Sequence, residues 1–212
     1  LSNTELTRDD ILCTTPEGLP GVLSNETQIV AFSSSDPLGI GMSNTTTKNF
    51  WKGELYTSYW SGQTLEYLAR TKEKYDFKVV AGGAGAWQFR QYPEKALPYV
   101  IDLVFEGYFE KSGPNIFTNI LEKKDHPCFY LEEDTCGQFI ESIKSPSVLG
   151  IVEISRGCGK GCKFCTMAHH KMEHLPVELI KNDIEINVHS GQRSAVLASE
   201  DFFRYGSGPS RP

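Results

Sequence analysis

Three cysteines lie close together at positions 158, 162 and 165, in a loop that follows an apolar run over 148–154. Glycines at 157, 159 and 161 allow positive φ angles, so the loop can wrap around a compact group. Three thiolates on one short loop form a soft, anionic ligand set that suits an iron–sulfur cluster or zinc. Structural zinc sites usually have four ligands in two pairs, and no matching second pair follows. The loop therefore favours a four-iron cluster with one open iron, with a zinc loop or three reduced thiols as the alternatives.

The spacing Cys158-x3-Cys162-x2-Cys165, with the aromatic Phe164 just before the last cysteine, resembles the cluster loop of radical S-adenosylmethionine (SAM) enzymes. The resemblance implies a [4Fe–4S] cluster on these three thiolates and a cofactor-binding role for Phe164. The amino and carboxylate groups of SAM would chelate the fourth iron. Reductive cleavage, supplied by an electron donor such as flavodoxin or ferredoxin, would then give a 5′-deoxyadenosyl radical. The cofactor supplies this chemistry, and the protein positions and shields it.

Glu200 follows a predicted strand over 195–198. In the radical SAM family a Gly-Gly-Glu-like motif at this place meets the amino group of SAM, and here only the glutamate of Ser199-Glu200 matches. The resemblance implies that Glu200 makes a charge-assisted hydrogen bond to the cofactor; a solvated loop acid is the alternative. Arg156, just before the loop, could screen the cluster's charge or be an ordinary surface arginine.

The N-terminal two thirds of the chain alternates apolar runs with amphipathic stretches. The pattern predicts strands over 27–34, 77–81, 101–105 and 128–131, and helices over about 62–75, 88–97 and 114–124. Ser61 is a candidate N-cap for the first helix. This alternation predicts an α/β domain with a mostly parallel sheet of Rossmann-like or flavodoxin-like type. Ligands in such sheets bind at the carboxyl ends of the strands.

Two turns in this domain resemble those of cobalamin-binding domains. Asp36-x-Leu38-x-x-Gly41 follows the first strand, and Gly82-Gly83 follows the second. The cobalamin motif is Asp-x-His-x-x-Gly, and Leu38 stands at the histidine position, so cobalt would lack a protein nitrogen ligand. The resemblance implies cobalamin contacts at Asp36, Gly41, Gly82 and Gly83, and methyl transfer through methylcobalamin.

The second turn also has a nucleotide-binding interpretation. Gly83-x-Gly85-x-x-Gln88 resembles the dinucleotide fingerprint Gly-x-Gly-x-x-Gly, but its third glycine is missing. Taken alone, this motif is a weak signal for a nicotinamide cofactor.

The C-terminal part predicts the first units of a partial (β/α) TIM-like barrel: a strand over 148–154, a helix over about 176–190 and the strand over 195–198. The expected organisation is an irregular segment over 1–26, the cobalamin-binding-like domain over 27–131, a linker over 132–147 and the truncated barrel over 148–212. A full eight-unit barrel takes about 250 residues. Because the chain starts with Leu1 and stops in a Gly- and Pro-rich tail, we expect a fragment of a longer protein.

The overall composition is that of a soluble globular protein, with a net charge of −6. No apolar run reaches the ~18 residues of a membrane span, and no secretory signal opens the chain. Cys13, Cys128 and Cys136 form no disulfide framework, so a reducing, cytoplasmic setting is expected. No basic stripe gives a strong nucleic-acid signal.

The sequence thus predicts a radical SAM iron–sulfur enzyme, with cobalamin-dependent methyl transfer as the finer expectation and an unidentified substrate. The alternative is a non-enzymatic binding or electron-transfer module, in which the cysteines hold a cluster or zinc and the α/β domain holds a nucleotide.

Overall fold

The computed structural model describes residues 4–41, 47, 49–96, 101–134, 136–163, 165 and 170–207. The chain divides into two compact units, unit 1 over Leu1–Glu132 and unit 2 over Glu133–Pro212. Each unit is described separately below.

Unit 1 contains a four-stranded parallel sheet. Its strands are β1 (Ile29–Ser33), β2 (Lys78–Gly82), β3 (Leu103–Glu106) and β4 (Phe129–Leu131). They lie in the order β1-β2-β3-β4, and each neighbouring pair is parallel. All four strands lie within two residues of their predicted bounds, so the predicted parallel α/β domain is confirmed.

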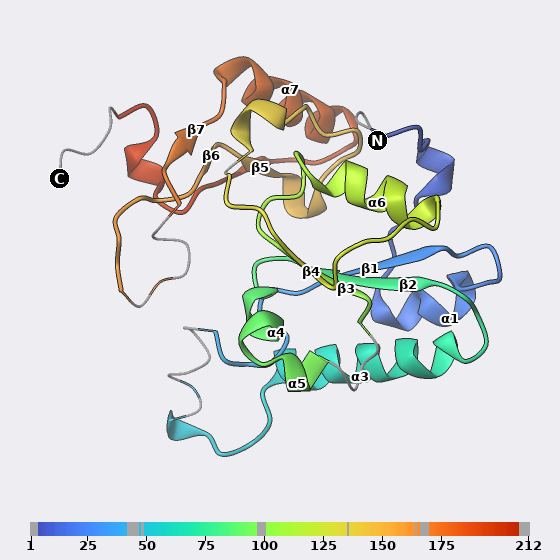
Figure 1. The fold of residues 1–212 in the computed structure, drawn as a ribbon. Coiled ribbons are helices and arrows are strands. Elements are labelled where there is room, and N and C mark those ends of the chain that lie inside the picture. Colours follow the sequence, from blue (N-terminus) through green and yellow to red (C-terminus); the bar gives the residue numbers. More distant parts are fainter. Residues whose placement is uncertain are drawn as a thin grey trace. The chain divides into compact units, whose positions relative to one another are not determined.

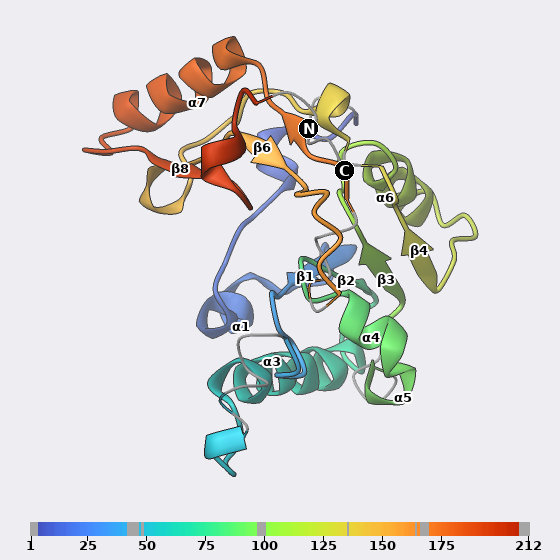
Figure 2. The same ribbon diagram turned by 90° about the vertical axis from the view of Figure 1, so that its left-hand side faces the viewer.

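Helices cover both faces of this sheet. Short helices come first, at Arg8–Asp10, at Pro16–Gly18 and in α1 (Leu19–Val22). The connections between strands hold α3 (Tyr56–Lys72), α4 (Trp87–Gln91), α5 (Pro93–Ala96) and α6 (Gly113–Leu121). Figure 1 shows α3, α4 and α5 on one side of the sheet and α6 on the other, and Figure 2 shows the same arrangement after a quarter turn.

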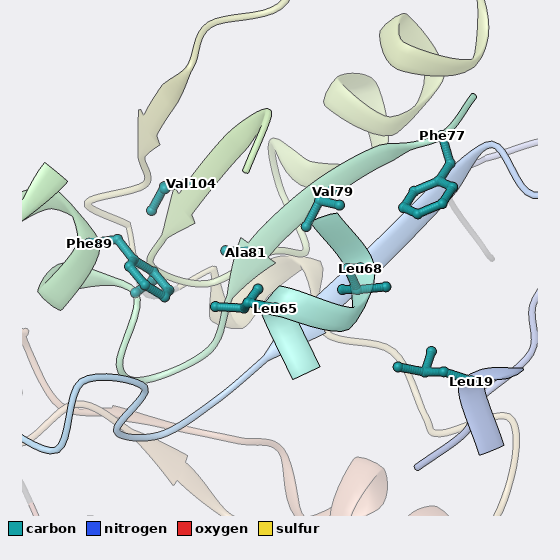
Figure 3. Packing of buried hydrophobic residues seen from close by; sticks show 9 residues of the cluster. Leu19, Leu65, Leu68, Phe77, Val79, Ala81, Phe89 and Val104 are labelled. Carbon is teal, nitrogen blue, oxygen red and sulfur yellow. The ribbon is translucent and has the colours of Figure 1, made fainter. Parts of the chain in front are cut away.

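The alternation of side chains along a strand explains the two-sided burial. Successive strand residues point to opposite faces. In β2, Val79 and Ala81 belong to the core under α3, whereas Val80 belongs to the core under α6. Figure 3 shows Leu65 and Leu68 of α3 beside Val79 and Ala81. Because both faces are buried, these strands consist of continuous apolar runs.

One partly buried carboxylate ties α3 to the sheet. Asp102 accepts hydrogen bonds from the Lys72 ammonium at 2.5 Å and the Val79 backbone N–H at 2.7 Å, and it lies 3.3 Å from the Lys78 ammonium. Burial raises the pKa of Asp102, but these partners outweigh burial and hold it below its usual value. The contact fixes the C-terminal end of α3 against the start of β2.

The start of α3 differs from the prediction. The helix runs from Tyr56 to Lys72, whereas the sequence predicted a helix over about 62–75. Ser61 is therefore not the N-cap but an internal residue, whose hydroxyl lies 3.3 Å from that of Ser34. No side-chain hydrogen bond caps the observed start of the helix, so the sequence had no capping signal to find there.

Unit 2 is built on one parallel strand pair and one short antiparallel pair. The parallel pair joins β5 (Ile151–Glu153) to β8 (Val196–Ala198), with α7 (Val177–His189) between them in the chain. The antiparallel pair joins β6 (Ser155–Arg156) to β7 (Glu173–His174) and was not predicted. Short 3-10 helices lie at Gly137–Phe139, Val148–Gly150 and Phe202–Arg204. The β5-α7-β8 unit agrees with the predicted strands and helix, except that residues 148–150 form a 3-10 turn.

Buried polar side chains of α7 hold the segment that leads into β5. The carboxylate of Asp183 accepts a hydrogen bond from the backbone N–H of Ile143 at 3.0 Å. The amide oxygen of Asn187 accepts one from the backbone N–H of Ser147 at 2.8 Å, and Asn187 is fully buried. Much of the stretch predicted as a linker over 132–147 is therefore anchored to α7.

None of the helices in the described part of the chain is both long enough and apolar enough to span a membrane.

Candidate functional site

The cysteine loop emerges from the β6–β7 pair. The backbone N–H of Cys158 donates to the carbonyl of His170 at 3.1 Å, and that of Cys165 donates to the carbonyl of Cys162 at 3.1 Å. Gly157 has a φ of +67°, and a Cβ there would lie 2.5 Å from the carbonyl oxygen of Lys171. Only glycine fits at that point, because the two ends of the loop approach too closely for a side chain. Gly159 and Gly161 also have positive φ, as predicted.

The three loop thiols are chemically suited to a metal cluster. All six cysteines of the chain lie among the described residues, and none of them forms a disulfide. Cys158, Cys162 and Cys165 are each half-buried, so they are shielded without being inaccessible. No three His, Cys, Asp or Glu side chains of the described residues converge closely enough to hold a metal ion. Three thiols on one short loop are nevertheless a ligand set of the chemical type that holds an iron–sulfur cluster.

Arg156 is buried in an ion pair rather than exposed on the surface. Its side chain is 7% exposed, and its guanidinium donates two hydrogen bonds to the Glu153 carboxylate, at 2.8 and 2.9 Å. This two-pronged geometry fixes the orientation of both groups. The surface-arginine alternative is therefore wrong, and Arg156 is a fixed positive charge at the entrance to the cysteine loop.

Glu200 lies at the carboxyl end of β8, close to this ion pair. The residue as a whole is exposed, yet desolvation of its carboxyl raises its pKa, and the negative charge of Glu153 raises it further. Arg156 and His170 act on the same carboxyl in the opposite direction. Arg156 and the loop residue His170 therefore lie near enough to Glu200 for their charges to act on its carboxyl. Phe164, the predicted aromatic neighbour of the cluster, lies outside the described residues.

The residues after β8 contact the cysteine loop, which sequence reasoning missed. Arg204 donates to the carbonyl oxygen of Cys158 at 2.5 Å, and Asp201 lies 2.5 Å from the ammonium of Lys160. The partners are 41 and 46 residues apart, and no local pattern signals such contacts.

Asp36, a predicted cobalamin contact in unit 1, is occupied within its own turn. It is 5% exposed, and one of its carboxylate oxygens accepts hydrogen bonds from the backbone N–H groups of Ile40 and Gly41 at 2.9 and 3.0 Å. The buried amide of Gln88 donates to the same oxygen at 2.6 Å. Asp36 therefore holds the turn after β1 and links it to α4.

The glycines after β2 make room for the chain itself. A Cβ on Gly83 would lie 2.7 Å from the Ser33 hydroxyl, and one on Gly85 would lie 2.3 Å from the Pro37 ring. The turns after β1 and β2 therefore pack closely against each other at these two glycines, where a side chain would not fit. Gly82 has no such crowding, with its nearest neighbour atom at 3.6 Å.

The strand order offers no crevice at this edge. In doubly wound sheets, ligands bind where the strand order reverses. The described strands run in sequence order across the sheet and contain no such reversal. The geometry of unit 1 therefore assigns Asp36, Gly41 and Gly83 to the packing of the turns.

Comparison with known proteins finds several relatives that carry the same printed name. The chain is 30% identical over 153 residues to the ribosomal protein uS12 methylthiotransferase RimO of Leptospira biflexa, covering 68% of this chain and 33% of that protein. It is 28% identical over 145 residues to the RimO of Fervidobacterium nodosum, covering 67% and 32%. The RimO of Dictyoglomus thermophilum is 26% identical over 153 residues. The chain spans about a third of the length of these curated relatives. No protein-family profile matches it.

These relatives confirm the resemblance that the cysteine loop indicated: the chain is a homologue of radical SAM proteins, at low identity. The particular relatives are methylthiotransferases. Residues 133–212 are too few to contain a match over two thirds of the chain, so the similarity extends into unit 1.

The cobalamin prediction is not supported by these comparisons. The relatives are named for methylthio transfer, and none indicates cobalamin or a cobalamin-dependent methyl transfer. The internal contacts of Asp36 and Gly83 give the physical reason for the misleading motif, because a tight pair of turns requires the same residue types.

Proposed function

We propose that unit 2 carries the cluster site of a radical SAM enzyme and that Cys158, Cys162 and Cys165 hold its [4Fe–4S] cluster. The homology to radical SAM proteins and the three half-buried thiols on one loop support this proposal. When bound, the cluster and SAM together supply a carbon-centred radical. The protein's own residues would bind and orient the cofactor and keep water away.

Glu200 is the proposed partner of the SAM amino group. A carboxylate there would accept a charge-assisted hydrogen bond from the ammonium. The raised pKa of Glu200 supports the assignment, since an ammonium ligand would offset the desolvation of the carboxylate and the repulsion from Glu153. The Glu153–Arg156 pair would orient the entrance to the loop without contacting the cluster.

We further propose methylthio transfer as the overall reaction class, acting on a macromolecular substrate. The single observation that carries this step is the shared name of the relatives, which are methylthiotransferases of ribosomal protein uS12. The β5-α7-β8 unit would belong to a β/α barrel that surrounds the cofactor, and an electron donor of the flavodoxin or ferredoxin type would reduce the cluster.

Spectroscopy on the reduced cluster tests the proposal without requiring turnover. After anaerobic reconstitution with iron and sulfide, adding SAM should change the electron paramagnetic resonance spectrum of the reduced cluster. Glu200→Gln should weaken SAM binding by about 1.5–3 kcal/mol, the usual range for a hydrogen bond to a charged group, with unchanged iron content. The matched control Glu185→Gln changes an exposed acid on α7 and should bind SAM normally.

A spectrum that ignores SAM would contradict the enzymatic reading and favour an electron-transfer module. Zinc in the anaerobically purified chain, without iron uptake, would favour a zinc loop. If Glu200→Gln binds SAM with unaltered affinity, Glu200 does not bind the cofactor and is a solvated loop acid.

A further inference from the structure

The segment over 199–207, here called the clasp, folds back across the base of the cysteine loop. It follows β8 and contains the 3-10 helix Phe202–Arg204. In Figures 1 and 2 this red segment lies beside β6, within unit 2. Five polar contacts join it to the loop and its flanking strands: Ser199 with Ser155, Asp201 with Lys160, Arg204 with Cys158, Tyr205 with Leu175, and Ser207 with His174.

Two of these contacts reach the loop at its first cysteine. The guanidinium of Arg204 donates to the backbone carbonyl of Cys158 at 2.5 Å, and the Asp201 carboxylate pairs with the Lys160 ammonium at 2.5 Å. A hydrogen bond from a charged donor to a carbonyl is among the stronger ones in proteins. These contacts restrain the backbone on both sides of Gly159.

The other contacts hold the clasp to the strands from which the loop emerges. The Ser155 and Ser199 hydroxyls lie 2.6 Å apart, and the Tyr205 hydroxyl donates to the carbonyl of Leu175 at 2.9 Å. Phe202 and Phe203 of the clasp are 49% and 94% exposed, and its Tyr205 packs against the apolar core cluster of unit 2, which contains no residue of the cysteine loop. Its polar contacts are therefore its main attachment to the loop.

We propose that the clasp is a positioning device for the cysteine loop, and that Arg204 is its central positioning residue, fixing the backbone of Cys158 in the arrangement that receives the cluster. The positioning of a cluster rests on the proposed function, whereas the restraint of the loop by the clasp does not. Arg204 and Lys160 also place two positive charges beside Cys158. Hydrogen bonding and net charge around a cluster are among the factors that set its reduction potential.

The metal-free chain provides the first test. Lys160 and Lys163 are exposed lysines inside the loop, so an endoproteinase specific for lysine can report how often the loop opens. Replacing Arg204 leaves the cleavage sites unchanged. We expect Arg204→Gln and Asp201→Asn each to speed cleavage at the loop lysines by at least about fivefold, because each removes one restraint. Arg193→Gln, which changes an exposed arginine shortly before β8, should have no effect.

The iron-loaded chain provides the second test. Arg204→Gln should lower the reduction potential of the cluster, because a positive charge that stabilises the extra electron is lost. Arg204→Lys should keep the potential near that of the parent chain and restore part of the protection, since it retains the charge but not the planar fork.

Circular dichroism checks that each variant remains folded. If the loop is cleaved at an unchanged rate in both Arg204→Gln and Asp201→Asn, the clasp does not restrain the cysteine loop, whether or not a cluster binds. Faster cleavage with an unchanged cluster potential and unchanged iron uptake would overturn the positioning role of Arg204. A protected loop in a chain that takes up no iron would instead count against the proposed function.

Discussion

Unit 1 and unit 2 differ in how completely their apolar residues are buried. In unit 1, two apolar clusters lie on opposite faces of a four-stranded sheet, and Leu68, Val79 and Leu103 are fully buried. In unit 2, one cluster contains four buried apolar residues, and Val196 and Leu197 of β8 are 49% and 42% exposed. The central strands β2 and β3 of unit 1 are buried over most of their length, whereas β8 of unit 2 leaves apolar residues accessible.

The polar side chains differ in the same way. The conspicuous motif residues of unit 1, such as Asp36 and Gly83, hold turns together. In unit 2 the motif cysteines have no disulfide partners, and neighbouring charges converge on their loop. The contacts of the motif residues therefore differ between the units: Asp36 and Gly83 contact their own turns, whereas the backbone of Cys158 is contacted by Arg204 from outside the loop.

The largest expected effect compares one leucine from each core. Leu68→Ala in unit 1 should cost about 4–5 kcal/mol, near the top of the range for buried leucines, because the surrounding sheet cannot collapse into the cavity. Leu175→Ala in unit 2 should cost about 2–3 kcal/mol, because its smaller cluster can relax.

Tryptophan fluorescence separates the two responses, because Trp51, Trp60 and Trp87 all lie in unit 1. Urea unfolding of Leu68→Ala should shift the fluorescence transition, and Leu175→Ala should shift mainly the circular dichroism. Equal shifts of the fluorescence transition by both variants would contradict the proposed difference between the cores.

A smaller effect tests whether Asp36 is structural. Asp36→Ala should destabilise unit 1 by about 1–3 kcal/mol, because it leaves the buried Gln88 amide and the turn N–H groups without their acceptor. Asp76→Ala, at an exposed position before β2, serves as the matched control and should change stability little. If Asp36→Ala is as stable as the parent chain, Asp36 does not have the structural role assigned to it.

The smallest expected effect concerns pH: Asp102 of unit 1 and Asp183 of unit 2 should change stability in opposite directions as the pH falls. In unit 1, hydrogen bonds from Lys72 and Val79 outweigh burial and lower the pKa of Asp102. The ionised Asp102 therefore contributes its full stabilisation at pH values above 3.8, which is the usual pKa of aspartate. This stabilisation is lost as the pH falls from 3.8 through the lower folded-state pKa. In unit 2, burial raises the pKa of Asp183, only partly offset by the Ile143 N–H. The protonated form of Asp183 is therefore favoured in the fold. Its contribution to stability is fully present at pH values below 3.8 and is lost as the pH rises through the raised folded-state pKa.

Two neutral substitutions check this difference by urea unfolding across acidic and neutral pH. Asp102→Asn should flatten the loss of stability below 3.8. Asp183→Asn keeps an oxygen acceptor for Ile143 and should remove the pH dependence just above 3.8, with a gain in stability at pH 7. A loss of stability at neutral pH in Asp183→Asn would show that its charge is favourable in the fold.

The sequence predicted the strands and most helices because apolar runs report burial directly. It missed the start of α3, where the serine that resembled a cap contacts Ser34 instead. The β6–β7 pair was also missed, since two-residue strands such as Ser155–Arg156 carry no periodic signal. In the candidate site, the cysteines and Glu200 could be selected from spacing and resemblance. The role of Arg204 depends on a contact with Cys158 that only the fold creates.

Metal analysis of the cysteine variants tests the central claim most directly. After anaerobic reconstitution, the parent chain should hold about four irons with matching sulfide, the content of one [4Fe–4S] cluster. Cys158→Ala, Cys162→Ala and Cys165→Ala should each lose the cluster, whereas Cys128→Ala, at an exposed cysteine of unit 1, should retain it. A full cluster in Cys162→Ala, or loss of the cluster in Cys128→Ala alone, would contradict the account.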